Sequence, residues 1–364
     1  MKIALRSSPR GIALIIVMVS IIVLAVLAGG FAYSMKVETK LAQNVSCESE
    51  LEWLGRSGVE RARWVLGLQL TVANEPYDFV DQKWGGGPGG LGTANSALAD
   101  VDLNQPVELG NGRITGIKIV DLERRVNINL ASEPVLKQAL MLVGADAADF
   151  ATIVSSIQDW IDRDDATHVS GAESDYYQDS NPPYVAKNGP IDDLAELLLI
   201  KGITPEIYWG PASTNHALAA FQAKQQPLFG FQTQPPSANV GLVDLFTPFS
   251  SGTINMNTAS VEVFQAVLGI DQNIASRIIE FRNQGEGMQE AAPIGSPGKG
   301  IREALLYAGF SNQAADQNAR FFSVRSRIFE VTVDAELGGY KRQFVAILGR
   351  NSPRDIQVLT FYAK

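Results

Sequence analysis

The chain has 364 residues, of which 46% are hydrophobic and 19% are charged, a balance that suits one or two globular domains. Its formal net charge of −9 at pH 7 argues against nucleic-acid binding, which needs a basic surface. The single cysteine, Cys47, excludes an intramolecular disulfide. The sequence has two histidines and neither an H-E-x-x-H nor a G-x-S-x-G motif, so it does not predict an enzyme.

The N-terminal stretch predicts a membrane span. Residues 11–35 include no charged residue, and residues 12–33 would reach roughly 33 Å as a helix, enough to cross the core of a bilayer. The basic residues Lys2, Arg6 and Arg10 precede this stretch, so its N-terminal end should stay on the cytoplasmic side of the membrane. The remainder of the chain would then lie on the far side.

The junction Arg10-Gly11-Ile12 precedes the apolar run and has three interpretations. A secretory signal peptide is disfavoured, because its apolar region usually covers only about 7 to 15 residues. A simple signal anchor would remain uncut. A short basic leader that ends in glycine before an apolar helix resembles the N-terminus of type IV pilins and of the pseudopilins of type II secretion. We therefore expect a prepilin leader of residues 1–11, cleavage after Gly11 and N-methylation of Ile12.

The helix should continue beyond the membrane as an amphipathic segment. No proline occurs in residues 12–70, and apolar or small residues recur there at three- or four-residue spacing. These positions are Leu41, Val45, Leu51, Leu54, Gly58, Ala62 and Val65. We expect one long helix with a transmembrane half, residues 12–35, and an amphipathic half, residues 36–70, in which Cys47 is a small packing residue.

Two groups of predicted strands flank the centre of the chain. The first is a hairpin of residues 106–109 and 113–122, joined by a turn at Gly110-Asn111-Gly112. The second group lies at residues 321–325, 328–337, 340–350 and 356–362, with Gly338-Gly339 as a two-residue turn. Residues 71–126 and 320–364 should together form one antiparallel sheet that packs against the amphipathic half of the helix.

A glycine-rich run from Trp84 to Gly92 separates the long helix from the first hairpin. Gly85, Gly87 and Gly90 match a G-x-G-x-x-G spacing, but no strand precedes them and Pro88 lies within the motif. The composition therefore predicts a flexible connector and no nucleotide site.

Residues 127–319 have the pattern of an inserted helical domain. The stretch from Asn127 to Leu136 is repeated in pattern by the stretch from Asn255 to Phe264, and a helix, a glycine turn and a second helix follow in each case. This pattern predicts an internal duplication and an all-α insert with helix-hairpin-helix or SAM-like repeats. Such turns can bind DNA phosphates through backbone N–H groups, or they can form a protein-binding module of the same shape.

An acidic stretch within this insert is the chemically richest part of the chain. Its carboxylates are Asp159, Asp162, Asp164, Asp165, Glu173, Asp175 and Asp179. Ala166 and Thr167 occupy positions where an EF-hand would need a ligand and a glycine, so the stretch is not an EF-hand. Two interpretations remain: a bound calcium ion, or a solvated acidic loop. His168 could ligate a metal or simply be exposed, and Asp159 could be a helix-surface residue.

Several motifs together resemble the general secretion pathway protein K family, the minor pseudopilins of type II secretion. The resemblance covers nearly the whole chain. It is carried by Arg10-Gly11-Ile12, Asn127-Ile128-Asn129, Asp159-Trp160-Ile161-Asp162, Gly171-Ala172-Glu173-Ser174-Asp175-Tyr176-Tyr177, Pro182-Pro183-Tyr184, Asp193-Leu194-Ala195-Glu196-Leu197, Gly202-Ile203-Thr204 and Ile254-Asn255-Met256-Asn257-Thr258-Ala259. It implies an α+β fold of pilin type, in which a long N-terminal helix packs on an antiparallel sheet, with a large all-α insert.

The resemblance also implies a role in assembly. The protein would be a non-enzymatic minor pseudopilin at the tip of the pseudopilus, where it starts or caps assembly to drive protein secretion across the outer membrane. Its partners would be other minor pseudopilins of the I and J type, the major pseudopilin and the prepilin peptidase, with no nucleic acid. It would be a single-pass protein of the bacterial inner membrane with its C-terminal domain in the periplasm.

Two residue-level expectations follow from the same resemblance. A calcium ion in the helical domain would be held by Asp162, Asp164, Asp165, Glu173, Asp175 and Asp179. The fifth residue after the cleavage point is Ile16, where most pilins have a glutamate that pairs with the N-terminal amine of a neighbouring subunit. The missing carboxylate suits a subunit with no other subunit above it, because an unpaired charge among apolar helices is costly.

Other functions remain open from the sequence. A minor pilin of a type IV pilus belongs to the same structural class, and its gene neighbourhood would distinguish it. A membrane-anchored helix-hairpin-helix DNA receptor would need more basic residues near its glycine turns. An anchored hydrolase is disfavoured by the absent catalytic motifs.

Overall fold

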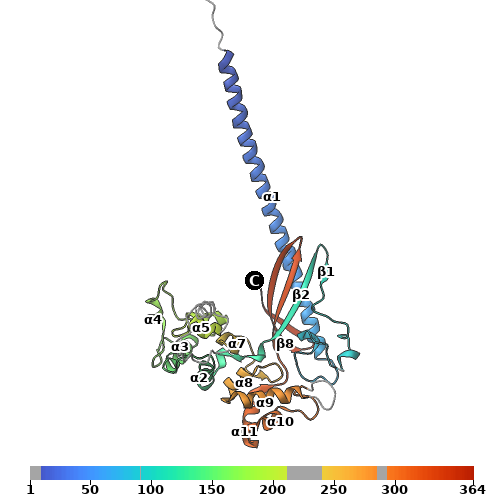
Figure 1. Ribbon diagram of the computed structural model, residues 1–364, viewed down its shortest axis with the longest axis vertical. Coiled ribbons are helices and arrows are strands. Elements are labelled where there is room, and N and C mark those ends of the chain that lie inside the picture. The colour runs from blue at the N-terminus through green and yellow to red at the C-terminus, as the bar shows by residue number, and fades with distance from the viewer. Residues whose placement is uncertain (1–9, 91, 211–239, 285–292) are drawn as a thin grey trace, which may run out of the picture.

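The computed structural model describes residues 10–90, 92–210, 240–284 and 293–364. Most of the expected leader, the polar Pro- and Gln-rich connection at residues 211–239, and part of the loop expected at residues 285–300 lie outside these ranges. The described chain has three parts: a long N-terminal helix, a five-stranded sheet and a helix-rich insert (Figure 1).

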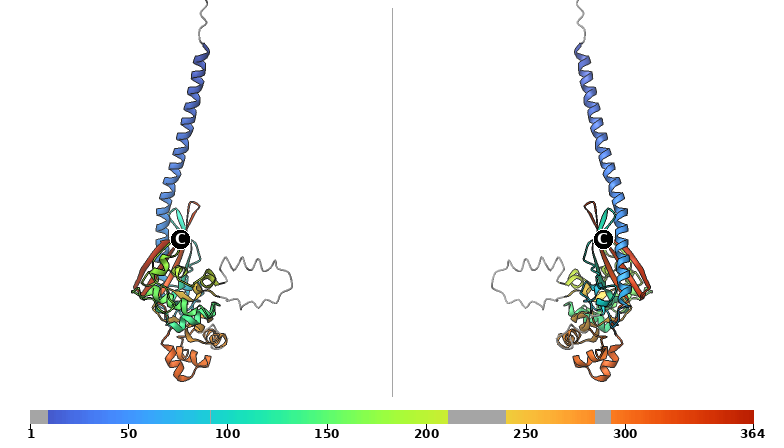
Figure 2. Two further views of the ribbon diagram at one scale, coloured as in Figure 1. Left: turned by 90° about the vertical axis from the view of Figure 1, so that its left-hand side faces the viewer. Right: turned by 90° about the vertical axis from the view of Figure 1, so that its right-hand side faces the viewer.

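The N-terminal helix α1 (Arg10–Gln69) is continuous over 60 residues, as the sequence predicts. The side chains of residues 13–35 are exposed, and this half projects away from the rest of the molecule (Figures 1 and 2). It contains a stretch long and apolar enough to cross a membrane. From Leu51 onward, one face of α1 is buried against the sheet.

The sheet has five strands, and every neighbouring pair is antiparallel. In spatial order they are β1 (Val107–Leu109), β2 (Gly112–Asp121), β7 (Ile328–Leu337), β8 (Tyr340–Ser352) and β9 (Asp355–Ala363). Gly338 and Gly339 both have positive φ angles, 56° and 87°, which suits the two-residue hairpin turn between β7 and β8. The predicted hairpins are therefore confirmed.

Glycines let α1 approach the sheet closely. A Cβ atom added to Gly55 would lie 2.5 Å from Cδ2 of Phe344, and one added to Gly58 would overlap the side chain of Val333. Ala62, one turn further along, is fully buried. The apolar face predicted for α1 thus includes small residues, because larger side chains there would overlap the side chains of the sheet.

The predicted flexible connector is wrong. Residues Lys83–Gly85 form a 3₁₀ turn, and Trp84 is 2% exposed with its ring edge-on to Phe329 at a centroid distance of 5.3 Å. The buried carboxylate of Glu75 accepts hydrogen bonds from Gln69, Gln82 and Thr93. These contacts, which composition does not reveal, fix the segment against the sheet.

The insert lies beyond the end of the sheet opposite the N-terminus (Figure 1). Its longer helices are α2 (Glu133–Leu142), α3 (Phe150–Ile161), α8 (Val261–Leu268), α9 (Gln272–Asn283), α10 (Ile301–Ala308) and α11 (Asn312–Ala319). The short helix η3 (Leu122–Arg124) follows β2 and precedes the insert. The shorter helices of the insert are η4 (Ile128–Leu130), α4 (Ser174–Gln178), η5 (Leu194–Leu199), α5 (Pro205–Trp209) and α7 (Leu242–Leu245). The helices α10 and α11 were not predicted from the sequence.

The insert is helix-rich but not all-α, which corrects the prediction. Strand β3 (Val126–Asn127) pairs in parallel with β4 (Phe246–Thr247). Strand β5 (Ile254–Asn255) pairs in parallel with β6 (Phe322–Ser323). Consequently the strand predicted at residues 321–325 pairs inside the insert and does not join the main sheet.

Each strand pair joins the two ends of one structural unit, and the two units are built alike. The first unit runs from β3 to β4, and the second unit runs from β5 to β6. In the first unit, the Asn129 amide accepts from Ile191 N–H at 2.7 Å and donates to Ile191 O at 3.0 Å. In the second unit, the Asn257 amide makes the same pair of bonds with Ile294, at 2.9 and 2.8 Å. In each unit, the second asparagine of the N-x-N pattern therefore fastens the backbone of a distant isoleucine.

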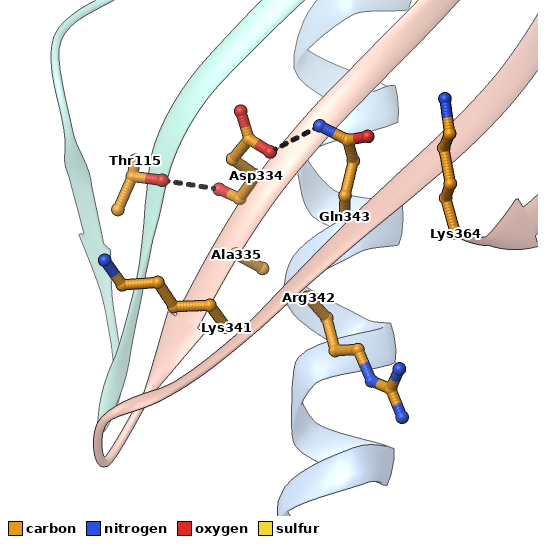
Figure 3. Close-up of a pocket in the computed structure, with 7 residues that line it drawn as sticks. All are labelled: Thr115, Asp334, Ala335, Lys341, Arg342, Gln343 and Lys364. Atoms are coloured by element: carbon orange, nitrogen blue, oxygen red, sulfur yellow. Dashed lines mark hydrogen bonds between the residues drawn. The ribbon is translucent and has the colours of Figure 1, made fainter. Parts of the chain in front are cut away.

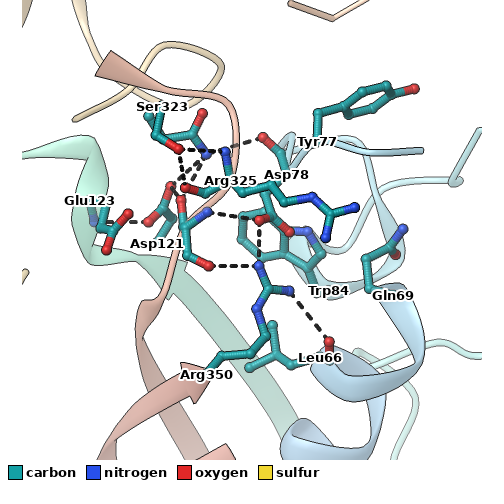
Figure 4. Close-up of polar contacts among 12 residues, drawn as sticks. Leu66, Gln69, Tyr77, Asp78, Trp84, Asp121, Glu123, Ser323, Arg325 and Arg350 are labelled. Atoms are coloured by element: carbon teal, nitrogen blue, oxygen red, sulfur yellow. Dashed lines mark hydrogen bonds and ion pairs between the residues drawn. The ribbon is translucent and has the colours of Figure 1, made fainter. Parts of the chain in front are cut away.

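The sheet and the insert have separate hydrophobic cores. Between them lies a buried polar network of Asp78, Asp121, Asn255, Thr258, Ser326 and Arg350 (Figure 4). Arg350 pairs with Asp78 and donates to Leu66 O in α1 and to Ser326 O. The Asp121 carboxylate accepts from the hydroxyls of Ser326 and Thr258 at 2.6 and 2.5 Å. The network thus links α1, the sheet and the second unit.

Candidate metal centre and processing site

The acidic stretch forms the turn between two helices of the first unit. Helix α3 ends at Ile161 with Asp162 as its C-cap, and α4 begins at Ser174 with Glu173 as its N-cap. The intervening loop returns to the end of α3, because its residues His168 and Ala172 bond to Asp159. Both flanking carboxylates, Asp162 and Glu173, are therefore held close to α3.

Asp159 organises this loop from a buried position, so the helix-surface interpretation is wrong. Its side chain is fully buried. Its Oδ1 accepts from the backbone N–H of His168 at 3.1 Å and contacts the Nδ1 of the same residue, and its Oδ2 accepts from Ala172 N–H at 2.7 Å. A Cβ atom at Gly171 would overlap the Asp159 carboxylate, which explains the glycine there.

Four buried oxygens in this region have no hydrogen-bond partner among the described residues. They are both carboxylate oxygens of Glu173, Oδ1 of Asp162 and Oδ1 of Asn188. Glu173 is only 4% exposed. Buried oxygens without donors are costly, because they lose their bonds to water and gain none. A cation is the partner that several carboxylate oxygens would share.

Electrostatics support the same conclusion. Burial, followed by the charges of Asp159, Asp162 and Asp165, raises the pKa of Glu173 to about 7. Burial and the charges of Asp164 and Asp159 also raise the pKa of Asp162. The negative charges of the loop therefore destabilise one another, and a bound cation would relieve this repulsion.

Asn188 is a residue that the sequence analysis did not select. Its amide Nδ2 donates to Asp164 O at 3.1 Å and to Asp165 Oδ1 at 2.8 Å. These bonds hold the 162–165 segment against residue 188, while the Asn188 Oδ1 keeps no partner among the described residues. The dipeptide Asn188-Gly189, with a positive φ of 48° at the asparagine, was the available signal for a special turn.

The predicted ligands differ in their placement. The charges of Asp162, Asp164 and Asp165 act on the carboxyl group of Glu173 and contribute to its raised pKa. Asp175 and Asp179 are exposed on and just after α4, and their carboxylates make no hydrogen bond with the described residues. His168 is half-exposed, and its Nδ1 lies 3.8 Å from Asp162 Oδ2. Asp159, Asp162 and His168 present ligand atoms within 4.8 Å of one another.

The expected processing site lies at the start of α1. Gly11 and Ile12 belong to the first turn of the helix, which begins at Arg10. Residues 1–9 of the expected leader lie outside the described residues.

The sheet carries a hollow of about 450 Å³ near the ends of β2, β7 and β8 (Figure 3). The Thr115 hydroxyl donates to Asp334 O at 3.1 Å, and Gln343 donates to the Asp334 carboxylate at 2.9 Å. Lys341 and Arg342 also line it. These residues include no pair of a nucleophile and a base, and the hollow gives no support for an enzyme.

Comparisons with known proteins agree with this architecture. The family model for type II secretion system protein K matches residues 117–210. The putative type II secretion system protein K of Escherichia coli K12 is 25% identical over 56% of this chain and 61% of its own length. The type II secretion system protein K of Pseudomonas aeruginosa PAO1 is 22% identical over 98% of this chain and 93% of its own length.

A solved structure shares the fold. The protein in the crystal structure of the GspK-GspI-GspJ complex from enterotoxigenic Escherichia coli matches with a TM-score of 0.60 at 17% identity, over 89% of this chain and 99% of that one. A long helix with an apolar span, packed on an antiparallel sheet, is the architecture expected of a pilin-like protein. In sequence and in fold, the chain is similar to protein K of type II secretion systems.

Proposed function

We propose that the chain is a minor pseudopilin that occupies the tip of a type II secretion pseudopilus and starts or caps its assembly. The shared fold with a protein solved in the GspK-GspI-GspJ complex is the observation that supports this most directly. On this proposal, the chain assembles with other minor pseudopilins of the I and J type, and with the major pseudopilin below them.

The shape of the molecule supports a terminal position. The insert broadens the end of the molecule farthest from the membrane segment (Figure 1). A subunit inside a shaft must pack against copies above and below it, and this bulk would obstruct such packing. Ile16 in place of an acidic residue also leaves no carboxylate for the amine of a subunit above.

The anchor supports a location in the inner membrane. The apolar half of α1 would span the bilayer once, and the sheet and insert would lie in the periplasm. We further propose that a prepilin peptidase cuts after Gly11 and that Ile12 is then N-methylated.

The first experiment is mass analysis of the N-terminus of protein isolated from membranes, with and without the prepilin peptidase. We expect loss of residues 1–11 and an added methyl group on Ile12 only when the peptidase is present. An intact Met1 in both samples would contradict assignment to the pilin class. If the leader is removed as expected, the gene neighbourhood would distinguish a type II secretion system from a type IV pilus.

We propose that the acidic loop binds calcium. Asp162, Asp164, Asp165 and Glu173 offer hard oxygen ligands, and Asn188 Oδ1 adds a neutral one. Asp175 and Asp179 remain candidate ligands. The four partnerless buried oxygens are what support a cation over a solvated loop.

Calcium binding is tested by thermal unfolding of chelator-treated protein. Added Ca²⁺ should raise the melting temperature of the wild type, and Glu173→Gln should remove most of this rise because it neutralises a buried ligand. Glu108→Gln, at an exposed position on β1, is the matched control. An equal calcium response in Glu173→Gln and wild type would refute the proposed site.

A DNA receptor is less consistent with the insert. Lys201 near one glycine turn donates to Gly171 O, and Arg277 near another stacks on Tyr307. Arg282 donates to the carbonyls of Met256 and Ala259. These cations are engaged within the protein, so salt-dependent DNA binding by the periplasmic part is not expected.

A further inference from the structure

Three short linkers join the sheet to the two units of the insert, and they meet around one cavity. The first linker, 122–125, connects β2 to β3, the second, 248–253, connects β4 to β5, and the third, 324–327, connects β6 to β7. The cavity has a volume of about 600 Å³, and its wall includes Glu123, Ser251 and Arg327, one residue from each linker. Protein interiors are normally close-packed, so a space of this size leaves room for the linkers to move.

Glu123 is the residue that the three linkers share. It belongs to η3 in the first linker, lies beside Asp121 and is 0% exposed (Figure 4). Its Oε1 accepts a long bond, 3.4 Å, from Ser251 N–H in the second linker, and the backbone of Arg327 in the third linker also stabilises its ionised form. Its Oε2 has no hydrogen-bond partner among the described residues. This buried carboxyl group thus contacts all three linkers, with fewer donors than an ionised carboxylate needs.

The arginines that line the cavity do not compensate the charge of Glu123. Arg350, near the end of β8, pairs with Asp78. Arg325, in the third linker, donates to Pro76 O at 2.7 Å. Arg327 is exposed, and its guanidinium makes no ion pair with Glu123 within the described chain. The other lining residues are uncharged and come from the end of α1, the second and third linkers, β6 and the end of β8: Leu70, Ser251, Thr253, Phe322, Ser323, Ser326, Asn351, Ser352 and Pro353.

The charged neighbours in the first linker do not compensate it either. Arg124 and Arg125 form no ion pair with Glu123 among the described residues, and Arg125 responds instead to acidic residues of the insert and the sheet. Burial raises the pKa of Glu123 to about 7, hydrogen bonding by Ser251 opposes this shift, and the like charge of Asp121 adds to it. The ionised form of Glu123 is therefore disfavoured in this arrangement.

We propose that the junction between sheet and insert is a pH-sensitive joint, which is closed while the Glu123 carboxyl group is protonated and opens when that group is ionised. A neutral carboxyl group stays buried at a modest cost, whereas a buried carboxylate without a counter-charge is stabilised by any movement that lets water reach it. The cavity provides space beside the group, and short linkers between rigid bodies are the usual places where such bodies rotate.

The sign of the pH dependence follows from the two states of the joint. In the open joint Glu123 would be hydrated and its pKa would be near its ordinary value of 4.5, whereas in the closed joint its pKa is about 7. The closed joint therefore holds the proton more tightly, is favoured below about pH 4.5 and loses this advantage as the pH rises to about 7. Between pH 5 and pH 8 the ratio of open to closed molecules should rise by a factor on the order of ten to a hundred.

The test measures the distance between the sheet and the second unit by double electron–electron resonance, on the full chain in detergent micelles at pH 5 and pH 8. Cys47→Ser removes the single cysteine, and spin labels are then attached at Lys118→Cys in β2 and Gln317→Cys in α11, two exposed positions. We expect one distance at pH 5 and an additional distance at pH 8. Labels at Ser57→Cys in α1 and Lys118→Cys lie on the same side of the joint and should give one distance at both pH values.

Two variants identify the titrating group. Glu123→Gln cannot ionise, so it should keep at pH 8 the distance that the wild type has at pH 5. Ser251→Ala removes a hydroxyl that lowers the pKa of Glu123, so the change in distance should extend to higher pH. Ser251 is exposed, so this variant tests the proposal even if Glu123→Gln does not fold. Glu108→Gln, at an exposed position on β1, is the control and should respond to pH as the wild type does.

The joint is independent of the proposed tip role, of leader cleavage and of calcium, because the acidic loop lies in the first unit and the measured distance joins the sheet to the second. The proposal is overturned if the wild-type distances are the same at pH 5 and pH 8, if the pH response persists in Glu123→Gln, or if Ser251→Ala responds over the same pH range as the wild type. Each of these results would leave the proposals on secretion and calcium intact.

Discussion

Arg350 occupies the centre of the network between sheet and insert, and both it and Asp78 have side chains that are 1% exposed. Arg350→Met should lower the free energy of unfolding by about 3 to 5 kcal/mol, because it leaves Asp78 buried without its counter-charge. Urea unfolding is the measurement. Arg354→Met, at an exposed position four residues later, should have little effect, and equal losses in the two variants would contradict this explanation.

Asp121 should make stability depend on pH. Burial raises its pKa from 3.8 to about 6, although hydrogen bonds from Ser326 and Thr258 oppose the shift. The folded state therefore holds the proton more tightly than the unfolded state, so the free energy of unfolding should fall as pH rises from about 4 to about 6. Asp121→Asn should flatten this part of the profile, and Asp355→Asn, on the exposed start of β9, should not.

At the scale of elements, the repeated asparagines should each fasten one loop. Asn257→Ala removes two bonds to Ile294 and should cost about 2 kcal/mol, with faster hydrogen exchange of the Ile294 amide. Asn273→Ala, on the exposed face of α9, is the control and should leave that exchange rate unchanged. Slow exchange at Ile294 in Asn257→Ala would show that other contacts hold the loop.

The contact between α1 and the sheet depends on a small residue. Gly58→Val would place side-chain atoms in the space that Val333 occupies, and overpacking of this kind typically costs about 1 to 3 kcal/mol. Ser57→Val adds the same side chain at the exposed neighbouring position and should be nearly neutral. Thermal unfolding of the two variants tests this expectation: Gly58→Val should lower the melting temperature, and Ser57→Val should not.

Local patterns predicted the elements that depend on near neighbours in the chain. The continuous α1, the β2 and β7 strands and the Gly338-Gly339 turn follow from periodicity and from the special angles that glycine allows. The short strands β3 to β6 could not be predicted in the same way, because two residues give no period and their partners are far away in sequence.

The candidate site was predictable only in part for the same reason. The clustered carboxylates are visible in the sequence, and the charges of Asp159 and Asp162 contribute to the raised pKa of Glu173. Burial of Asp159 and the contribution of Asn188 arise only when distant segments pack together. Trp84 illustrates the opposite error, since a glycine-rich composition concealed a buried ring.

At the scale of the whole molecule, the exposed apolar half of α1 should control fractionation. Side chains such as Leu14, Ile22 and Phe31 are 58 to 69% exposed and would need lipid or detergent around them. We expect the chain to stay with membranes after a high-salt wash and to be released by detergent. Recovery in the salt-soluble fraction would contradict a membrane-spanning α1.

The insert has a kinetic consequence for folding. Strands β2 and β7 are neighbours in the sheet, yet Asp121 and Ser326, which bond at the junction, are 205 positions apart. Closing a flexible loop of that length costs about 3 kcal/mol more chain entropy than closing one of about six residues. The parallel pairs β3–β4 and β5–β6 bring the two ends of each unit together. If the two units fold first, they shorten the loop that must close between β2 and β7. The sheet should therefore form no faster than the insert folds.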